Sequence, residues 1–215
     1  MKHLIPLYCL MSLLIMQSCE RKIRTEYEYE TNPVFTWGQA YFWGDCYANY
    51  NIENHVLSLY AFTDSLQLND KGQLTGFGQY LYLDDIFVSP ADTIFPEGIY
   101  TVSASREAMT IEPGSLFKED RLEMDRGACI YFIEKAEQLT TRKFIVEGNM
   151  TVSYTDHETI HFKFDFILDD DTELNGYFET EKLIIYDDSV SKESVSSQKI
   201  NLFYKKHISH SKTMI

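Results

Sequence analysis

The sequence predicts an all-β protein built as a single antiparallel β-sandwich or flattened β-barrel. Three observations lead to this prediction. Short runs of alternating apolar and polar residues, split by turn residues, follow one another from residue 34 to residue 204. The chain has 15 Tyr, 14 Phe and 2 Trp, which are residues that pack well in β-sheets. No segment in this region carries a convincing apolar stripe at helical spacing.

The clearest strand is predicted at Thr159–Leu168, where apolar residues at every second position alternate with mainly polar ones. This period of two is typical of a strand with one buried face and one face in water. Runs of similar length predict the other strands. They are Ala40–Tyr47, His55–Phe62, Gly78–Val88, Ile99–Ala104, Cys129–Lys135, Phe144–Tyr154, Tyr177–Tyr186 and Lys199–Tyr204.

A weak internal repeat indicates how the strands are arranged. Residues 69–77 (NDKGQLTGF) are similar to residues 169–177 (DDDTELNGY), and residues 97–103 (EGIYTVS) to residues 147–153 (EGNMTVS). Each unit is expected to form strand, acidic turn and strand, with glycine at a turn exit or bulge. Two interpretations stay open, namely a fold built from two repeated hairpin units and convergent hairpin chemistry.

The first 18 residues predict a signal peptide. Lys2 is followed by the run Leu4–Met16, which is apolar apart from Ser12. These 13 residues are too few for a transmembrane helix, which needs about 20, and have the length of a secretory core segment. The small residue Ser18 directly precedes Cys19, so we expect cleavage between them and export of the protein.

The stretch Met16-Gln17-Ser18-Cys19 resembles the cleavage site of bacterial lipoprotein precursors. The resemblance implies that Cys19 becomes the first mature residue and carries acyl chains, which anchor the protein in a membrane of the bacterial cell envelope. We expect this to be the outer membrane, and the side of the membrane is left open. The alternative is an ordinary secretory signal with an incidental cysteine.

The whole chain also resembles uncharacterised all-β lipoproteins of similar size from Bacteroidetes. The resemblance rests on Ser18-Cys19, an early aromatic strand, GIY at residues 98–100 and GNMTV at residues 148–152. It implies an all-β domain behind a lipid anchor, and the family brings no established activity.

The division of the chain follows from its composition. Residues 19–33 are polar and read as a flexible tether, residues 34–204 form the antiparallel β domain, and residues 205–215 are a basic tail that we expect to fray. Loss of Lys2 with the signal takes the net charge from −14 to −15. Such an acidic protein is a poor match for nucleic acid, and anionic lipid repels it, so the acyl chains must provide the anchoring.

Two cysteines remain in the mature domain, Cys46 and Cys129. An exported protein meets an oxidising compartment, where they could form a disulfide. The other interpretation is two small buried thiols, and we favour it because both cysteines lie within apolar, strand-like runs. No histidine has a recognisable spacing to either cysteine, which argues against a catalytic thiol.

Two motifs have the composition of metal sites but not the required context. Residues 157–161 (HETIH) match the zinc-protease pattern, which needs both His157 and His161 on one face of a helix. In a strand the two residues would be about 13 Å apart, too far for one zinc ion. Residues 169–173 (DDDTE) lack the glycine of a calcium loop at the sixth position. We therefore predict hairpin turns, no cofactor and no metal site.

An aromatic cluster near the start of the domain supplies the candidate ligand-binding residues Trp37, Tyr41 and Trp43. Aromatic rings beside carboxylates can stack on sugars or hold an apolar ligand. Tyr41, Trp43 and Tyr47 alternate along one strand face, however, and aromatic residues commonly pack in β cores. We favour core packing and keep the ligand site as the alternative.

The function predicted from the sequence is a non-enzymatic binding or assembly role for a lipid-anchored envelope protein. Its partners would be the membrane, through Cys19, and either a glycan or another envelope protein. A carbohydrate-binding accessory module with exposed aromatic residues is the first alternative. The second is an envelope hydrolase, which would need His157, His161 or paired carboxylates gathered in a pocket.

Overall fold

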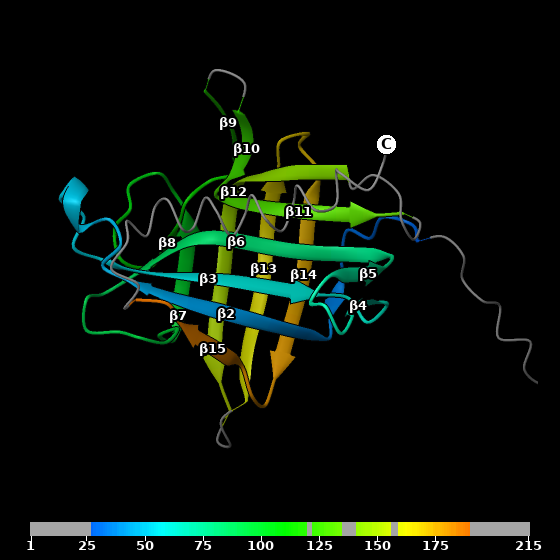
Figure 1. Cartoon of the computed structure of the whole chain (residues 1–215), viewed down its shortest axis with the longest axis horizontal. Helices are drawn as coiled ribbons and strands as arrows, with labels where there is room; N and C mark the ends of the chain where they lie inside the picture. Colours follow the sequence, from blue (N-terminus) through cyan, green and yellow to red (C-terminus); the bar gives the residue numbers. More distant parts are fainter. Residues whose placement is uncertain (1–26, 120–121, 135–140, 156–158, 190–215) are drawn as a thin grey trace, which may run out of the picture.

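The computed structural model describes residues 27–119, 122–134, 141–155 and 159–189, and this part of the chain is all-β (Figure 1). It contains one short 3-10 helix, η1 (Ala48–Tyr50). The strands are β1 (Val34–Phe35), β2 (Trp37–Gly44), β3 (His55–Phe62), β4 (Leu66–Leu68), β5 (Leu74–Gly76), β6 (Gly78–Val88), β7 (Gly98–Val102), β8 (Thr110–Ile111), β9 (Ser115–Glu119), β10 (Leu122–Arg126), β11 (Ala128–Ile133), β12 (Thr141–Tyr154), β13 (Ile160–Leu168), β14 (Glu173–Thr180) and β15 (Ile184–Asp187).

The strands form two layers that join at their corners into a barrel-like arrangement. One layer contains β12, β13 and β14, and the strands β2, β3, β6 and β11 of the other run across them (Figure 1). Strand β11 pairs with both β12 and β6, and β1 pairs with β14 directly before the chain continues as β2. Crossed layers of this kind enclose one core between them. The predicted all-β sandwich or flattened barrel is therefore confirmed.

Most pairs among the described strands are antiparallel, as predicted, and three of these pairs are parallel. The parallel pairs are β1 with β14, β15 with β2, and β7 with β8. Each involves a strand of at most five residues. Strands β1 and β15 lie at the two ends of the strand order, whereas β7 and β8 lie between β12 and β6. These additions close the layers without changing the fold class.

The core lies between the two layers. Strand β13 contributes Phe162, Phe164 and Phe166, all buried, whereas Lys163 on the same strand is exposed. The alternation predicted at Thr159–Leu168 is confirmed. The opposite layer contributes buried aliphatic side chains, among them Leu57, Leu59, Leu81 and Leu83.

The bounds of two predicted strands agree with the structure at both ends. The bounds of His55–Phe62 and Gly78–Val88 match β3 and β6. The predicted strand Tyr177–Tyr186 instead divides into β14 and β15. The turn expected from the repeat at residues 69–77 lies in the hairpin β4–β5, and the hairpin β9–β10 was not predicted. The predicted strand Lys199–Tyr204 lies outside the described residues.

Residues 27–33, which we assigned to the tether, contact the domain. The backbone N–H of Tyr27 donates to the carbonyl of Glu134, and the side chain of Gln79 hydrogen-bonds both the N–H and the carbonyl of Glu30. This end of the tether is thus held against β6 and the end of β11. The signal peptide and Cys19 lie outside the part of the chain that the structure describes.

Both pairs of repeated segments adopt related structures. Residues 69–77 contain the turn from β4 to β5 and strand β5 itself. Residues 169–177 contain the turn from β13 to β14 and the first part of β14, so both segments are hairpin turns with the strand that follows. The second pair lies in β7 and β12, which are antiparallel neighbours. Their shared glycines, Gly98 and Gly148, have φ of +142° and +112°. The similarity matches hairpin chemistry, and duplication stays a prediction.

Candidate functional site

The most distinctive feature of the domain is a layer of aromatic rings on the side of β2, β3, β6, β11 and β15 that faces away from the core. We call this side the outer face. The rings alternate with core residues along each strand and contact one another from strand to strand. They are Trp37, Tyr41, Trp43, Tyr60, Phe62, Tyr80, Tyr82, Tyr131 and Tyr186.

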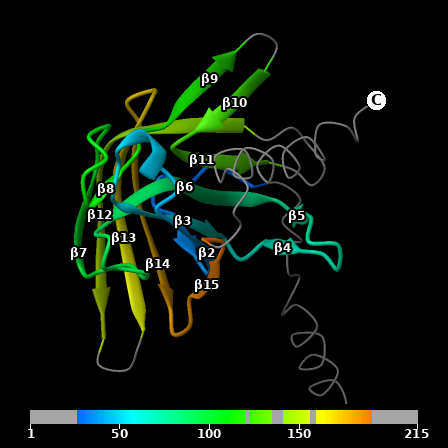
Figure 2. The same cartoon turned by 60° about the vertical axis from the view of Figure 1, so that its left-hand side comes forward.

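The ring contacts run across the whole outer face. Trp37 stacks on Phe62 with 3.9 Å between centroids, Phe62 lies 5.5 Å from Tyr80, and Tyr80 lies 4.7 Å from Tyr131. The hairpins β4–β5 and β9–β10 project beside this sheet (Figure 2). Aromatic pairs at such distances stabilise a sheet by about 0.5–1.5 kcal/mol each beyond their burial.

Both candidate tryptophans take part in packing. Trp43 is buried, and its indole N–H donates to Ser58 Oγ at 2.8 Å. Trp37 is half-buried against Phe62, and its indole N–H donates to the carbonyl of Leu66 at 2.8 Å. The polar atom of each ring thus has a partner within the domain.

The third candidate, Tyr41, lies at an accessible margin of the outer face. Its half-buried ring stacks on Tyr186 of β15, with 5.2 Å between centroids, and Tyr186 is 45% exposed. The amide of Gln39 donates to the Tyr41 hydroxyl at 3.2 Å. Burial, then Tyr186 and then Asp188 raise the pKa of Tyr41. We call Gln39, Tyr41, Tyr186 and Asp188 the tyrosine edge.

Sequence analysis did not single out Tyr186. Its place in the site depends on the parallel pairing of β15 with β2, which sets Tyr186 directly opposite Tyr41. The sequence carries one sign of this arrangement. Ile184 and Tyr186 lie two residues apart at the end of a predicted strand and therefore share a face, which is exposed in the structure.

Two consecutive carboxylates, Asp84 and Asp85, are buried in the middle of β6. The register between β3 and β6 shifts here, between Leu57 and Leu59, as at a β-bulge. The hydroxyl of Ser58 donates to the carbonyl of Asp84 at 2.6 Å. Sequence analysis did not single out these residues, although two acids inside an apolar run are an unusual pattern.

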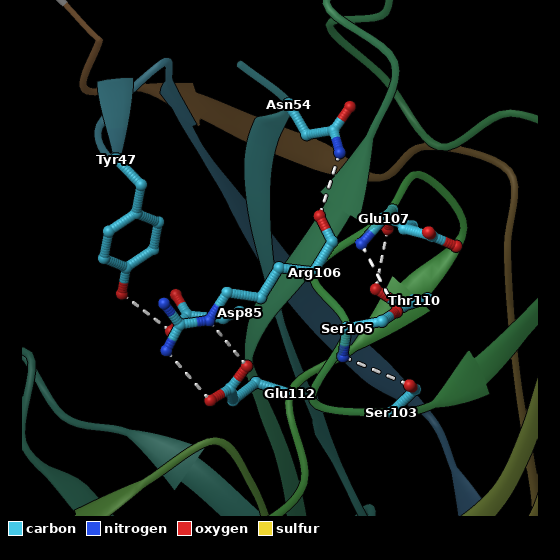
Figure 3. A network of polar contacts seen from close by, with 9 residues as sticks. All are labelled: Tyr47, Asn54, Asp85, Ser103, Ser105, Arg106, Glu107, Thr110 and Glu112. Carbon is cyan, nitrogen blue, oxygen red and sulfur yellow. Dashed lines mark hydrogen bonds and ion pairs between the residues drawn. The ribbon is translucent and has the colours of Figure 1, made fainter. Parts of the chain in front are cut away.

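A network of polar contacts extends from Asp85 (Figure 3). The Tyr47 hydroxyl donates to the Asp85 carboxylate at 2.8 Å, and the Arg106 guanidinium makes two hydrogen bonds to Glu112, of 3.1 and 3.2 Å. The hydrogen bond to Glu112 is the main cause that raises the pKa of Arg106. The amide of Asn54 donates to the Arg106 carbonyl at 2.9 Å. These contacts hold the loop before β8 against β6 and the segment around η1.

The two metal-like motifs are placed as follows. His161 lies in the extended strand β13, with Nδ1 3.2 Å from the Glu179 carboxylate, while His157 and Glu158 fall outside the described residues. Residues 169–173 form the turn between β13 and β14 together with the first residue of β14, and Asp170 in this turn pairs with Lys143 at 2.8 Å. Within the described ranges, no three side chains of His, Cys, Asp or Glu are grouped closely enough to hold a metal ion.

Cys46 and Cys129 do not form a disulfide with each other. Cys129 is buried among the outer-face rings beside Tyr80 and Tyr82, whereas Cys46 packs in a separate cluster around Trp43. Burial strongly raises the pKa of the Cys129 thiol, which keeps it protonated and unreactive.

Comparison with protein-family models, curated protein sequences and solved structures finds no match to this chain. Across residues 27–189, apart from the gaps given above, no helix has the length and apolar character needed to cross a bilayer.

Proposed function

We propose that this protein is a lipid-anchored protein of the bacterial cell envelope whose β domain has a non-enzymatic binding or assembly role. The tyrosine edge carries the binding part of the proposal, because its aromatic surface is accessible at the margin of a domain whose other aromatic residues are mostly packed. The anchor rests on the sequence, where Cys19 directly follows a short apolar run and a small residue.

The acyl chains would supply the membrane affinity by themselves. Each buried CH₂ group contributes about 0.8 kcal/mol, and two or more chains give stable attachment. The mature charge of −15 opposes adsorption to anionic lipid, so the protein surface would not replace the anchor.

For the anchor we predict that Cys19→Ser abolishes labelling by radioactive palmitate and moves the protein from the membrane fraction to the soluble fraction. The serine hydroxyl does not form the thioether that carries the lipid. Cys46→Ser is the matched control and should keep both the label and the membrane location. Unchanged labelling and fractionation of Cys19→Ser would refute the anchor.

A second candidate function, glycan binding, is favoured by the composition of the tyrosine edge. Aromatic rings stack on the apolar faces of sugars, and amides and carboxylates hydrogen-bond their hydroxyl groups. The edge combines the rings of Tyr41 and Tyr186 with the amide of Gln39 and the carboxylate of Asp188.

The glycan candidate predicts that soluble polysaccharides retard the protein in affinity electrophoresis and that Tyr186→Ala weakens this binding at least tenfold, because a stacking ring is lost. Tyr177→Ala is the control, since Tyr177 is 50% exposed on β14 in the other layer. Equal weakening by both substitutions, or no retardation of the unmodified protein, would contradict glycan binding. An envelope protein would then be the partner to seek.

A further inference from the structure

The first described residues, 27–35, run across both layers of the domain, and we call them the strap. At its start, the backbone N–H of Tyr27 donates to the carbonyl of Glu134, directly after β11, at 2.8 Å. Further along, the carbonyl of Thr31 accepts the backbone N–H of Asn175 on β14 at 2.7 Å. The strap ends as β1, which pairs with the same strand β14. It is thus tied to one layer at its start and to the other at its end.

The side chains at both ends of the strap are packed. Tyr27 is 5% exposed, and the centroid of its ring lies 6.0 Å from that of Phe132. Phe35 is 1% exposed, and its ring lies 5.8 Å from that of Phe164 in the core. Because the strap is held from its first residue onward, the chain enters the folded domain at Tyr27, well before β1 begins.

The entry point at Tyr27 lies at one end of the layer formed by β2, β3, β6 and β11. Ile133 at the end of β11 pairs with Gly78 at the start of β6, and the hairpin β4–β5 projects beside them (Figure 1). We call this end, together with the hairpin, the strap end. His55 at the start of β3 pairs with Val88 at the end of β6, so η1 lies at the opposite end. Strand β6 has 11 residues, which sets the two ends about 33 Å apart.

The link between the proposed lipid anchor and the strap is short. Seven residues, 20–26, separate Cys19 from Tyr27. A fully extended chain spans at most about 3.6 Å per residue, so the Cα atoms of Cys19 and Tyr27 are no more than about 29 Å apart, whatever path the chain takes. If the η1 end rested on the membrane, Tyr27 would stand about 33 Å above it, beyond the reach of this link.

Charge also distinguishes the two ends. The hairpin, residues 66–76, contains one Asp and one Lys and so has no net charge. Residues 45–54 around η1 contain Asp45 and Glu53 and no basic side chain. Anionic lipid repels acidic surfaces, so the strap end approaches a lipid surface with less electrostatic repulsion than the η1 end does.

We propose that the short link holds the strap end toward the membrane that contains the acyl chains, with the hairpin β4–β5 nearest the lipid headgroups and the η1 end pointing away. This orientation rests on the proposed anchor at Cys19. It keeps the tyrosine edge available to a partner beyond the membrane surface. Tyr41 lies four residues along β2 from Trp37, which places it about 13 Å from the strap end.

Energy transfer from a fluorophore on the domain to acceptor lipids tests this orientation. The full-length lipidated protein is reconstituted into vesicles of phosphatidylethanolamine and phosphatidylglycerol that contain a rhodamine-labelled lipid. The fluorophore is attached through azidophenylalanine at position 67 in the hairpin or, as the matched control, at position 50 in η1. Gln67 and Tyr50 are both exposed, so neither label disturbs the core. We expect at least twofold more transfer from position 67, because transfer falls steeply with distance.

Equal transfer from the two positions, or more transfer from position 50, would overturn the orientation, while palmitate labelling of the same protein would leave the anchor standing. Absence of the palmitate label would overturn the anchor and the orientation together. Insertion of 20 Gly and Ser residues between Glu26 and Tyr27 should bring the ratio of the two transfers toward one, since the link no longer restrains the domain. A ratio unchanged by the insertion would show that the short link does not hold the strap end toward the membrane.

Discussion

Phe164→Ala is expected to lower the free energy of unfolding by about 3–5 kcal/mol, because it empties the middle of the core. Phe164 is 0% exposed on β13 and meets the rings of Phe35 and Phe166, each at 5.8 Å between centroids. These partners come from β1 at the barrel closure and from β13 itself, so backbone movement cannot readily refill the cavity.

Urea denaturation followed by circular dichroism measures this change. Lys163→Ala is the control, because Lys163 is the preceding residue on β13 and its side chain is 68% exposed in a pair with Asp165. Exposed ion pairs contribute about 0–1 kcal/mol, so this control should change stability little. If Lys163→Ala lowers the free energy of unfolding more than Phe164→Ala does, then β13 presents its other face to the core.

Gly148→Ala is expected to lower the free energy of unfolding by about 3 kcal/mol, since two effects act at the same position. The φ of +112° is a conformation that residues with a side chain rarely adopt, which costs about 1–3 kcal/mol. The added Cβ would also lie 2.2 Å from the carbonyl oxygen of Asp165, a backbone atom that cannot rotate away. Strand β12 would have to separate from β13 near its bulge.

Gly72→Ala is the matched control for Gly148→Ala in the same denaturation experiment. Gly72 has φ of +69°, and a Cβ there meets nothing within 4 Å. At this position only the left-handed backbone conformation opposes alanine, and it lowers the free energy of unfolding by about 1–2 kcal/mol. If Gly148→Ala lowers the free energy of unfolding no more than Gly72→Ala does, the close approach of β12 and β13 is contradicted.

The fold class and the principal strands could be predicted because a period of two is visible within a single strand. Strand β13 shows this alternation, because every second residue is buried against the core. Strands β3 and β6 are buried on both faces along most of their length, and they could be predicted as continuous apolar and aromatic runs bounded by turn residues. The hairpin β9–β10 was missed because its strands, SLFKE and LEMDR, mix charged and apolar residues without filling the core. The parallel pairings of β1 with β14 and of β15 with β2 bring together segments far apart in the chain, which local patterns do not record.

The candidate site was predicted only in part, for the same reason. The rings of Trp37, Tyr41 and Trp43 are visible in the sequence as an aromatic run, but their exposure depends on neighbours from other strands. Tyr186 joins Tyr41 only through the pairing of β15 with β2. The burial of Asp84 and Asp85 depends on the bulge in β6, which shifts the register and has no local signature in the sequence.

The lipid anchor is tested most directly by mass spectrometry of the N-terminal peptide of the protein isolated from bacterial membranes. We predict a mature chain that begins at Cys19 and carries acyl chains on this residue. A chain that still begins at Met1, or one cut elsewhere with an unmodified Cys19 thiol, would contradict the assignment of this β domain to a lipid-anchored protein.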